Sequence, residues 1–149
     1  MYVQLFNLAG LAIIGWALMI IFPWWSWTKR LARSAAAPVY LAALYVVGVV
    51  PLFIAAGPGM MREFVTPEGV LRLLSNQDVA LMVWIHILVF DQLAGILIFR
   101  DNLRERVVPI PVQSAILFLT LMFAPAGFLL YYGIRVARKK GPALLESGA

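Results

Sequence analysis

Two ionisable side chains lie inside a long apolar run of this sequence. Asp91 is near the middle of residues 79–99, and His86 lies five positions before it. A charged side chain at the centre of a bilayer costs roughly 2.5–3.5 kcal/mol on insertion scales, so such residues usually face a bundle interior or a water-filled site. A carboxyl group in a dry setting can act as a general acid or base, and an imidazole can shuttle protons or bind the metal of a tetrapyrrole. We therefore expect chemistry near this part of the chain.

Both residues also have a structural interpretation. Asp91 could hydrogen-bond a group on another helix, and His86 could fix the packing of two helices. At about 100° per residue the two side chains diverge by about 140°, so one site using both must wrap round the helix or include a neighbouring chain. Asp91 shares its stripe with Trp84 and Gly95. Gly95 leaves room either for a ligand or for the close approach of another helix.

Asp101 follows the same apolar run and lies among three arginines, Arg100, Arg104 and Arg106. This surrounding favours an interfacial salt bridge, with direct substrate contact as the alternative.

The composition identifies an integral membrane protein. The chain has 149 residues, of which 63% are hydrophobic, and a mean hydropathy of +0.91, whereas soluble domains are about 45–50% apolar. It contains no cysteine and one histidine, which excludes disulfides, thiolate metal sites and a multi-histidine metal site within one chain. We expect a single compact domain over residues 1–149, with no metal and no cofactor.

The net charge of +5 does not indicate nucleic-acid binding. The basic residues gather at the ends of apolar runs, as they do where helices are anchored at an anionic headgroup surface. These clusters are Lys29–Arg30–Arg33, Arg100–Arg104–Arg106 and Arg135–Arg138–Lys139–Lys140. With four spans, each side of the membrane would carry six basic residues, so the sequence leaves the orientation open.

Four apolar segments reach the length of about 20 residues that crosses a bilayer. The predicted spans are residues 5–25, 38–56, 79–99 and 112–132. A short interfacial helix is expected between the second and third spans, where Thr66 and Pro67 read as an N-cap and a first-turn proline. The predicted fold is therefore an all-α membrane protein with four transmembrane helices.

Local signals refine the ends of these segments. Ser75 is predicted to cap the third span together with Asp78. Pro125 interrupts the fourth span, and Tyr131 and Tyr132 are expected to lie in the membrane interface at its end.

The third span also carries a family resemblance. Trp84–Ile85–His86, Phe90–Asp91, Gly95 and Asp101 resemble the W-x-H-x-x-x-F-D-x-x-x-G-x-x-x-x-x-D signature of the ABA4-like family, small membrane proteins that include the plastid protein needed for neoxanthin formation. Further similar segments are Leu5–Phe6–Asn7, Trp16, Pro23, Phe64, Glu68–Gly69–Val70 and Thr120–Gly127. The chain departs from the family pattern at Gln92, Ile96, Leu97 and Ala124.

The resemblance implies a redox-neutral isomerisation of a xanthophyll. In that reaction an epoxide oxygen is protonated, its bond to a ring carbon breaks, and a proton leaves the neighbouring vinylic carbon to give an allene. Asp91 would be the acid, and the base would be His86 or another group such as Asp101 or Glu63. Trp84, Gly95 and Asp101 would contact the substrate, a carotenoid or another long apolar lipid.

Other readings of the sequence remain open. The protein could bind a carotenoid without modifying it, or serve as a non-catalytic small subunit of a larger assembly such as a pigment–protein complex. A small transporter is a further alternative, which would require oligomerisation. The protein could thus act alone, as a homo-oligomer or within a larger membrane complex. Because no plastid-type transit segment precedes the first span, we expect a bacterial relative located in the inner membrane.

Overall fold

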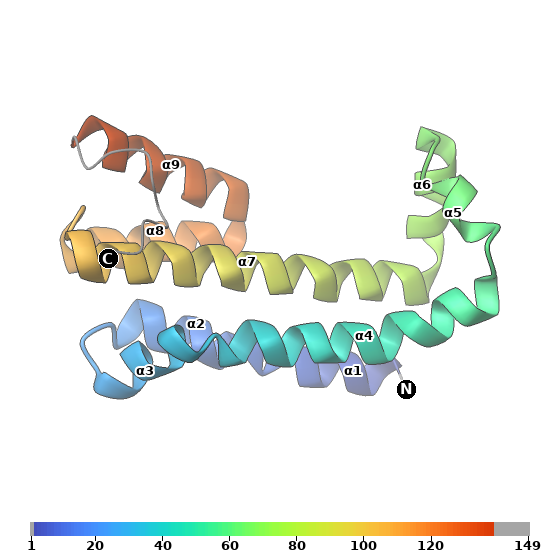
Figure 1. Ribbon diagram of the computed structural model, residues 1–149, viewed down its shortest axis with the longest axis horizontal. Helices are drawn as coiled ribbons and strands as arrows, with labels where there is room; N and C mark the ends of the chain where they lie inside the picture. The colour runs from blue at the N-terminus through green and yellow to red at the C-terminus, as the bar shows by residue number, and fades with distance from the viewer. Residues whose placement is uncertain (1, 139–149) are drawn as a thin grey trace, which may run out of the picture. The chain divides into compact units, whose positions relative to one another are not determined.

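The computed structural model describes residues 2–138, and the regular structure of this part of the chain is helical (Figure 1). The predictions that concern Lys139 and Lys140 lie outside the described residues. The helices are α1 (Tyr2–Gly10), α2 (Ala12–Ile21), α3 (Ser26–Ser34), α4 (Ala36–Ala56), α5 (Met60–Glu63), α6 (Pro67–Ser75), α7 (Gln77–Glu105), α8 (Ile110–Met122) and α9 (Ala124–Ala137).

The helices group into two compact units, which are described one at a time. Of the described residues, the first unit comprises 2–11 and 38–89, and the second comprises 12–37 and 90–138. Helix α7 is continuous and contributes its first part to the first unit and its second part to the second.

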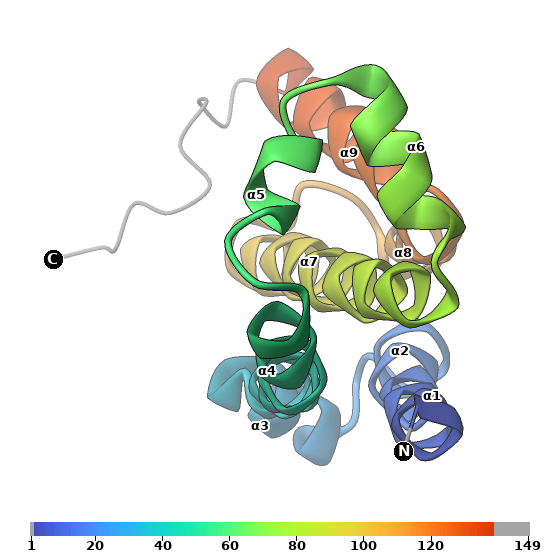
Figure 2. The same ribbon diagram turned by 90° about the vertical axis from the view of Figure 1, so that its right-hand side faces the viewer.

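The first unit is built on contacts between α1, α4 and the beginning of α7. A side chain at Gly48 of α4 would collide with Met82 of α7 and come within 3.1 Å of Leu5 in α1, so the absence of one allows these helices to pack closely. The Tyr40 hydroxyl of α4 donates a hydrogen bond of 3.0 Å to the carbonyl oxygen of Leu8 in α1. Helices α5 and α6 form the connection from α4 to α7 (Figures 1 and 2).

The second unit holds a buried apolar core from α2, α3, the end of α7, α8 and α9. The Ser114 hydroxyl of α8 donates a 2.7 Å hydrogen bond to the carbonyl oxygen of Ile20, which ties α8 to α2. Large core side chains are Trp16, Met19, Ile98, Phe99, Leu117 and Tyr131.

The prediction of four spans is confirmed only in part. Within the described residues, three helical segments are long and apolar enough to cross a membrane, residues 2–21, 36–56 and 77–105. The predicted fourth span is not one helix, because α8 ends at Met122 and α9 begins at Ala124. Phe123 has φ −144° and ψ 74°, outside the helical region, and Pro125 sits in the first turn of α9.

Helices α8 and α9 instead fold back on each other through this break (Figure 1). Gly127 lies directly against the backbone and hydroxyl of Thr120, where any side chain would collide. A helical segment of about 20 residues is needed to cross the bilayer core, and neither helix reaches it. The two short helices therefore pack as a hairpin.

The region before α7 confirms one predicted cap and corrects another. The Thr66 hydroxyl accepts a 3.1 Å hydrogen bond from the Gly69 amide, as predicted for the start of α6. The cap of α7 is Asn76 and not Ser75, because the side-chain oxygen Oδ1 of Asn76 accepts hydrogen bonds from the amides of Asp78 and Val79. Ser75 donates to the carbonyl oxygen of Leu71 and so closes the preceding helix, and the single expected interfacial helix is two helices, α5 and α6.

Candidate functional site

Helix α7 carries every residue of the predicted catalytic and substrate-binding set. Trp84 and His86 belong to the first unit, and Asp91, Gly95 and Asp101 to the second. The side chain of Trp84 is 50% exposed, whereas Gly95 is buried, so the predicted stripe runs from an open to a packed environment.

His86 lies at a small apolar cavity in the first unit. Its ring contacts the ring of Tyr45 on α4, with the centroids 5.4 Å apart. The cavity measures about 200 Å³, and its remaining lining is apolar, with side chains such as Val49, Phe53 and Val83. Sequence reasoning missed Tyr45, because its position opposite His86 depends on the packing of α4 against α7.

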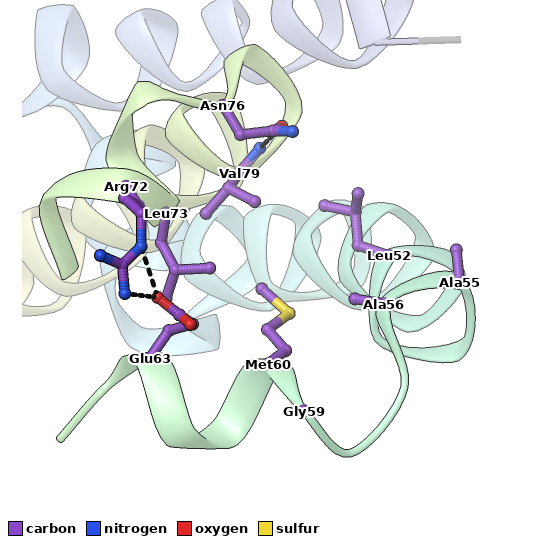
Figure 3. Close-up of a pocket in the computed structure, with 10 residues that line it drawn as sticks. All are labelled: Leu52, Ala55, Ala56, Gly59, Met60, Glu63, Arg72, Leu73, Asn76 and Val79. Carbon is purple, nitrogen blue, oxygen red and sulfur yellow. Dashed lines mark hydrogen bonds and ion pairs between the residues drawn. The ribbon is translucent and has the colours of Figure 1, made fainter. Parts of the chain in front are cut away.

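A second and larger cavity of the first unit lies among α4, α5, α6 and the beginning of α7 (Figure 3). Its volume is about 710 Å³. An ion pair between Arg72 and Glu63, 2.7 Å long, forms part of its wall. Figure 3 shows the Met60 side chain projecting between this ion pair and the α4 residues Leu52 and Ala56.

The two cavities share part of their wall. Leu52, Met60 and Val79 line both of them. Apolar surface therefore extends from the ion pair of Glu63 and Arg72 to the rings of Tyr45 and His86. Ligand sites in proteins are commonly apolar with a small number of placed polar groups, and this pair of cavities has that character.

Asp91 is half-buried in the second unit. Among the residues that the structure describes, its carboxylate has neither a hydrogen-bond nor an ion-pair partner. The next residue, Gln92, is 1% exposed. Its side-chain nitrogen lies so close to Gly15 of α2 that a Cβ atom at Gly15 would be only 3.0 Å away from it. Gln92, where the family pattern has an apolar residue, therefore fits beside α2 because Gly15 has no side chain.

Gly95 lies against the indole of Trp16. A side chain added at Gly95 would come within 2.5 Å of the ring, and Trp16 is itself 2% exposed. Close approach of a neighbouring helix, one of the two predicted uses of Gly95, is therefore present in the second unit. Its contact with a substrate remains a prediction.

Asp101 is part of a buried cluster with Tyr131 and Arg135 of α9. Its Oδ2 accepts a 2.7 Å hydrogen bond from the Tyr131 hydroxyl and a 2.9 Å bond from Nε of Arg135. Nη2 of Arg135 donates to the second carboxylate oxygen at 3.2 Å. Because all three side chains are buried, their charges and polar atoms are satisfied by one another.

This cluster corrects one expectation about α9 and adds a partner for Asp101. Tyr131 does not face lipid as a belt residue would, because it is fully buried and donates a hydrogen bond to Asp101. Asp101 forms a salt bridge with Arg135 of α9, which the sequence did not offer as a partner. The four-residue spacing of Tyr131 and Arg135, which places both on one face of a helix, is the sequence signal that could have indicated a shared partner.

Within residues 2–138, no three His, Cys, Asp or Glu side chains come together in a way that could hold a metal ion. Glu63, the other base considered from the sequence, is engaged in its exposed ion pair with Arg72.

Comparison with known proteins gives the family. A family model described as ABA DEFICIENT 4-like matches residues 4–131. The chain is also similar to the chloroplastic Protein ABA DEFICIENT 4 of Arabidopsis thaliana, with 26% identity over 124 residues, which is 78% of this chain and 53% of the plant protein. The chain thus spans about half the length of this curated relative. No solved structure matches the chain significantly. Because the family model covers most of its length, the chain belongs to the ABA4-like family.

Proposed function

We propose that this protein holds a carotenoid within the membrane and isomerises it by acid–base chemistry. The observation that carries the proposal is the pair of apolar cavities in the first unit, which share a wall and end at the rings of His86 and Tyr45. A carotenoid is long and apolar and has polar groups confined to its end rings. Such a molecule fits a continuous apolar surface that has polar side chains at its two ends.

The end rings would be recognised by different groups. An oxygenated ring in the larger cavity would find the ion pair of Glu63 and Arg72, which can donate and accept hydrogen bonds. A ring that reaches the smaller cavity would find the Tyr45 hydroxyl and the imidazole of His86. Trp84 lies two residues before His86 on α7, is half exposed and lines neither cavity, so its contact with the polyene stays a prediction.

Asp91 is proposed as the acid and His86 as the base. Asp91 lines neither of the two cavities. Because the two side chains diverge by about 140° around α7, one substrate would have to wrap round the helix or take one of the two groups from a neighbouring chain. In the reaction that the family resemblance implies, the acid gives its proton to the epoxide oxygen as the carbon–oxygen bond breaks. The base takes a proton from the neighbouring vinylic carbon, and the electron pair of that bond completes the allene. No electrons enter or leave, so the substrate and the product have the same composition.

The state of Asp91 supports a ligand-facing role over a purely structural one. A non-catalytic subunit would be expected to bury this carboxylate against a fixed protein donor. Among the described residues no such donor contacts Asp91, although the neighbouring carboxylate of Asp101 has a full set of partners. This contrast between two acids on one helix favours the acid–base proposal.

Conversion of substrate tests the proposal directly. The protein would be produced in bacterial membranes that contain violaxanthin, and the extracted pigments would be separated by chromatography. We expect a product of unchanged mass with an allenic absorption spectrum. Asp91→Asn keeps the shape of the side chain but removes its titrating proton, so it should lower product formation at least about a hundredfold, the usual range for an acid–base residue.

Asp78→Asn is the matched control, because Asp78 is an acid in the first turn of the same helix and should leave conversion unchanged. Equal conversion by Asp91→Asn and the wild type would exclude the acid role of Asp91. Bound pigment without any conversion would contradict the proposed isomerase activity and would support carotenoid binding alone. The proposed location of this protein is a bacterial inner membrane, whereas its relative in Arabidopsis thaliana is chloroplastic.

A further inference from the structure

A third cavity, in the second unit, has a strongly basic lining. It measures about 660 Å³ and lies where the end of α7 and the start of α8 meet the α2–α3 turn. Among the described residues, three cationic side chains line it, Lys29, Arg106 and Arg138, and no carboxylate does. Three positive charges around one hollow favour the binding of an anion.

The neutral polar groups of this cavity form an ordered chain that ends in a spare donor. The Val108 amide donates to Oδ1 of Asn102 at 2.8 Å, which fixes the orientation of the Asn102 amide. Nδ2 of Asn102 must then be the donor to the Val108 carbonyl at 3.0 Å and to Oε1 of Gln113 at 2.6 Å.

The orientation of Gln113 follows from this chain, because its oxygen is the acceptor. Its side-chain nitrogen is therefore a donor, and it has no partner within the described residues although Gln113 is 2% exposed. A buried donor without a partner is costly, by about 1–3 kcal/mol. This nitrogen is itself enclosed, so it marks a polar wall of the cavity and is not placed to contact a ligand there.

The position of the cavity indicates where the anion comes from. Helix α8 begins here, and a helix start carries partial positive charge. The adjoining α2–α3 turn exposes Trp24 and Trp25, and the first turn of α3 exposes Trp27. Tryptophan is enriched at the headgroup level of membranes. The basic cavity and these indoles belong to the same unit, at the polar end of its apolar helices.

We propose that this cavity is a binding site for a phosphate group, and that the headgroup of an anionic phospholipid supplies it. Arg106 and Lys29 provide charge-assisted hydrogen bonds to the phosphate oxygens. Nη1 of Arg138 already donates to the Val107 carbonyl at 2.8 Å, which holds this guanidinium at the rim. The site is independent of the carotenoid proposal.

Arg106 allows a variant that removes charge without harming the backbone. It has φ +49°, in the left-handed region that glycine adopts at little cost. Arg106→Gly should therefore lose the side chain and leave the fold at least as stable. Lys29→Gln is the second variant, and Arg33→Gln is its control, because it removes the same charge from the next turn of α3 without touching the cavity.

The test measures binding of two probes to the full-length protein in a non-ionic detergent. Native mass spectrometry counts retained phosphatidylglycerol against phosphatidylcholine, and phosphorus NMR titration follows inorganic phosphate. We expect one phosphatidylglycerol per protein, with affinity reduced about tenfold in Arg106→Gly and in Lys29→Gln and unchanged in Arg33→Gln.

The two probes separate the possible sources of the phosphate. If Arg106→Gly and Lys29→Gln weaken the binding of inorganic phosphate but the lipid does not bind, the phosphate site is confirmed and the lipid source is wrong. If Arg106→Gly and Lys29→Gln bind both probes as well as Arg33→Gln does, the site itself is wrong.

Discussion

Asp91 and Asp101 of α7 have opposite surroundings, which indicate a reactive role for one and a structural role for the other. The carboxylate of Asp101 receives hydrogen bonds from Tyr131 and Arg135 and is buried with them. Asp91 is half-buried and has no such partner among the described residues. A carboxylate with such partners is held in one position, whereas one without a fixed donor can meet a ligand. We therefore assign stability to Asp101 and reactivity to Asp91.

Removing the charge of Asp101 should destabilise the protein severely. Asp101→Asn leaves the buried guanidinium of Arg135 without its counter-ion, and breaking a buried pair in this way costs about 3–5 kcal/mol. Tyr131→Phe removes one hydrogen bond and should cost about 1–1.5 kcal/mol. The free energy of unfolding, measured by titration with sodium dodecyl sulfate in mixed micelles, checks both values.

Glu63→Gln is the control for this series. Its ion pair with Arg72 is exposed, with 34% and 66% of the two side chains accessible, so the expected loss is about 0–1 kcal/mol. If Asp101→Asn were no more destabilising than Glu63→Gln, the cluster would not be the clamp between α7 and α9 that its geometry indicates.

At the scale of helices, glycines mark where the elements touch. Each of three glycines leaves space for a close neighbour. Met82 packs against Gly48, Trp16 packs against Gly95, and the backbone at Thr120 packs against Gly127. Membrane helices associate chiefly through close packing of this kind, because the hydrophobic effect does not drive helices together in lipid. The positions of these glycines therefore determine which helices are neighbours.

Gly95→Ala should weaken the second unit. Its methyl group would lie within 2.5 Å of the Trp16 ring, which is buried and cannot move freely, and overpacking of this kind costs about 1–3 kcal/mol. Gly133→Ala is the matched control, because a methyl group there meets nothing within 4 Å and the helix should gain up to about 1 kcal/mol. Equal thermal stability of the two variants would contradict the packing role of Gly95.

The helices that the sequence predicts well are those whose signal is local. The second and third spans follow from apolar runs of spanning length, and the start of α6 follows from Thr66 and Pro67. The fourth span is not confirmed as one helix, because a break at Phe123 lets α8 and α9 pack on each other, with Gly127 against Thr120. Hydropathy does not distinguish one long helix from two short ones that pack together.

The sequence predicts candidate site residues on α7 and, beyond it, only Glu63. The sequence singles out His86, Asp91 and Asp101 because they are ionisable residues in or near an apolar run. Their partners, Tyr45 and Arg135, come from other helices and depend on how those helices pack. Such pairings need the tertiary structure, because no local spacing links α4 or α9 to α7.

At the scale of the whole molecule, the surface is suited to a lipid environment. Large apolar side chains are widely exposed among the described residues, including Ile54 at 78% and Val65 at 82%. Water would disfavour such a surface, whereas lipid tails accept it. Both proposed ligands, a carotenoid and an anionic phospholipid, accordingly reside in or at the membrane.

Retention of pigment by the purified protein tests the central claim most directly. The protein would be extracted in mild detergent from carotenoid-producing membranes, and bound pigment would be counted from the absorption spectrum. Val49→Phe fills the cavity beside His86, and Val39→Phe adds the same bulk at a position of α4 that is 64% exposed. We predict one carotenoid per protein in the wild type and in Val39→Phe, and little in Val49→Phe. A colourless wild type, or equal pigment in the two variants, would contradict carotenoid binding at this cavity.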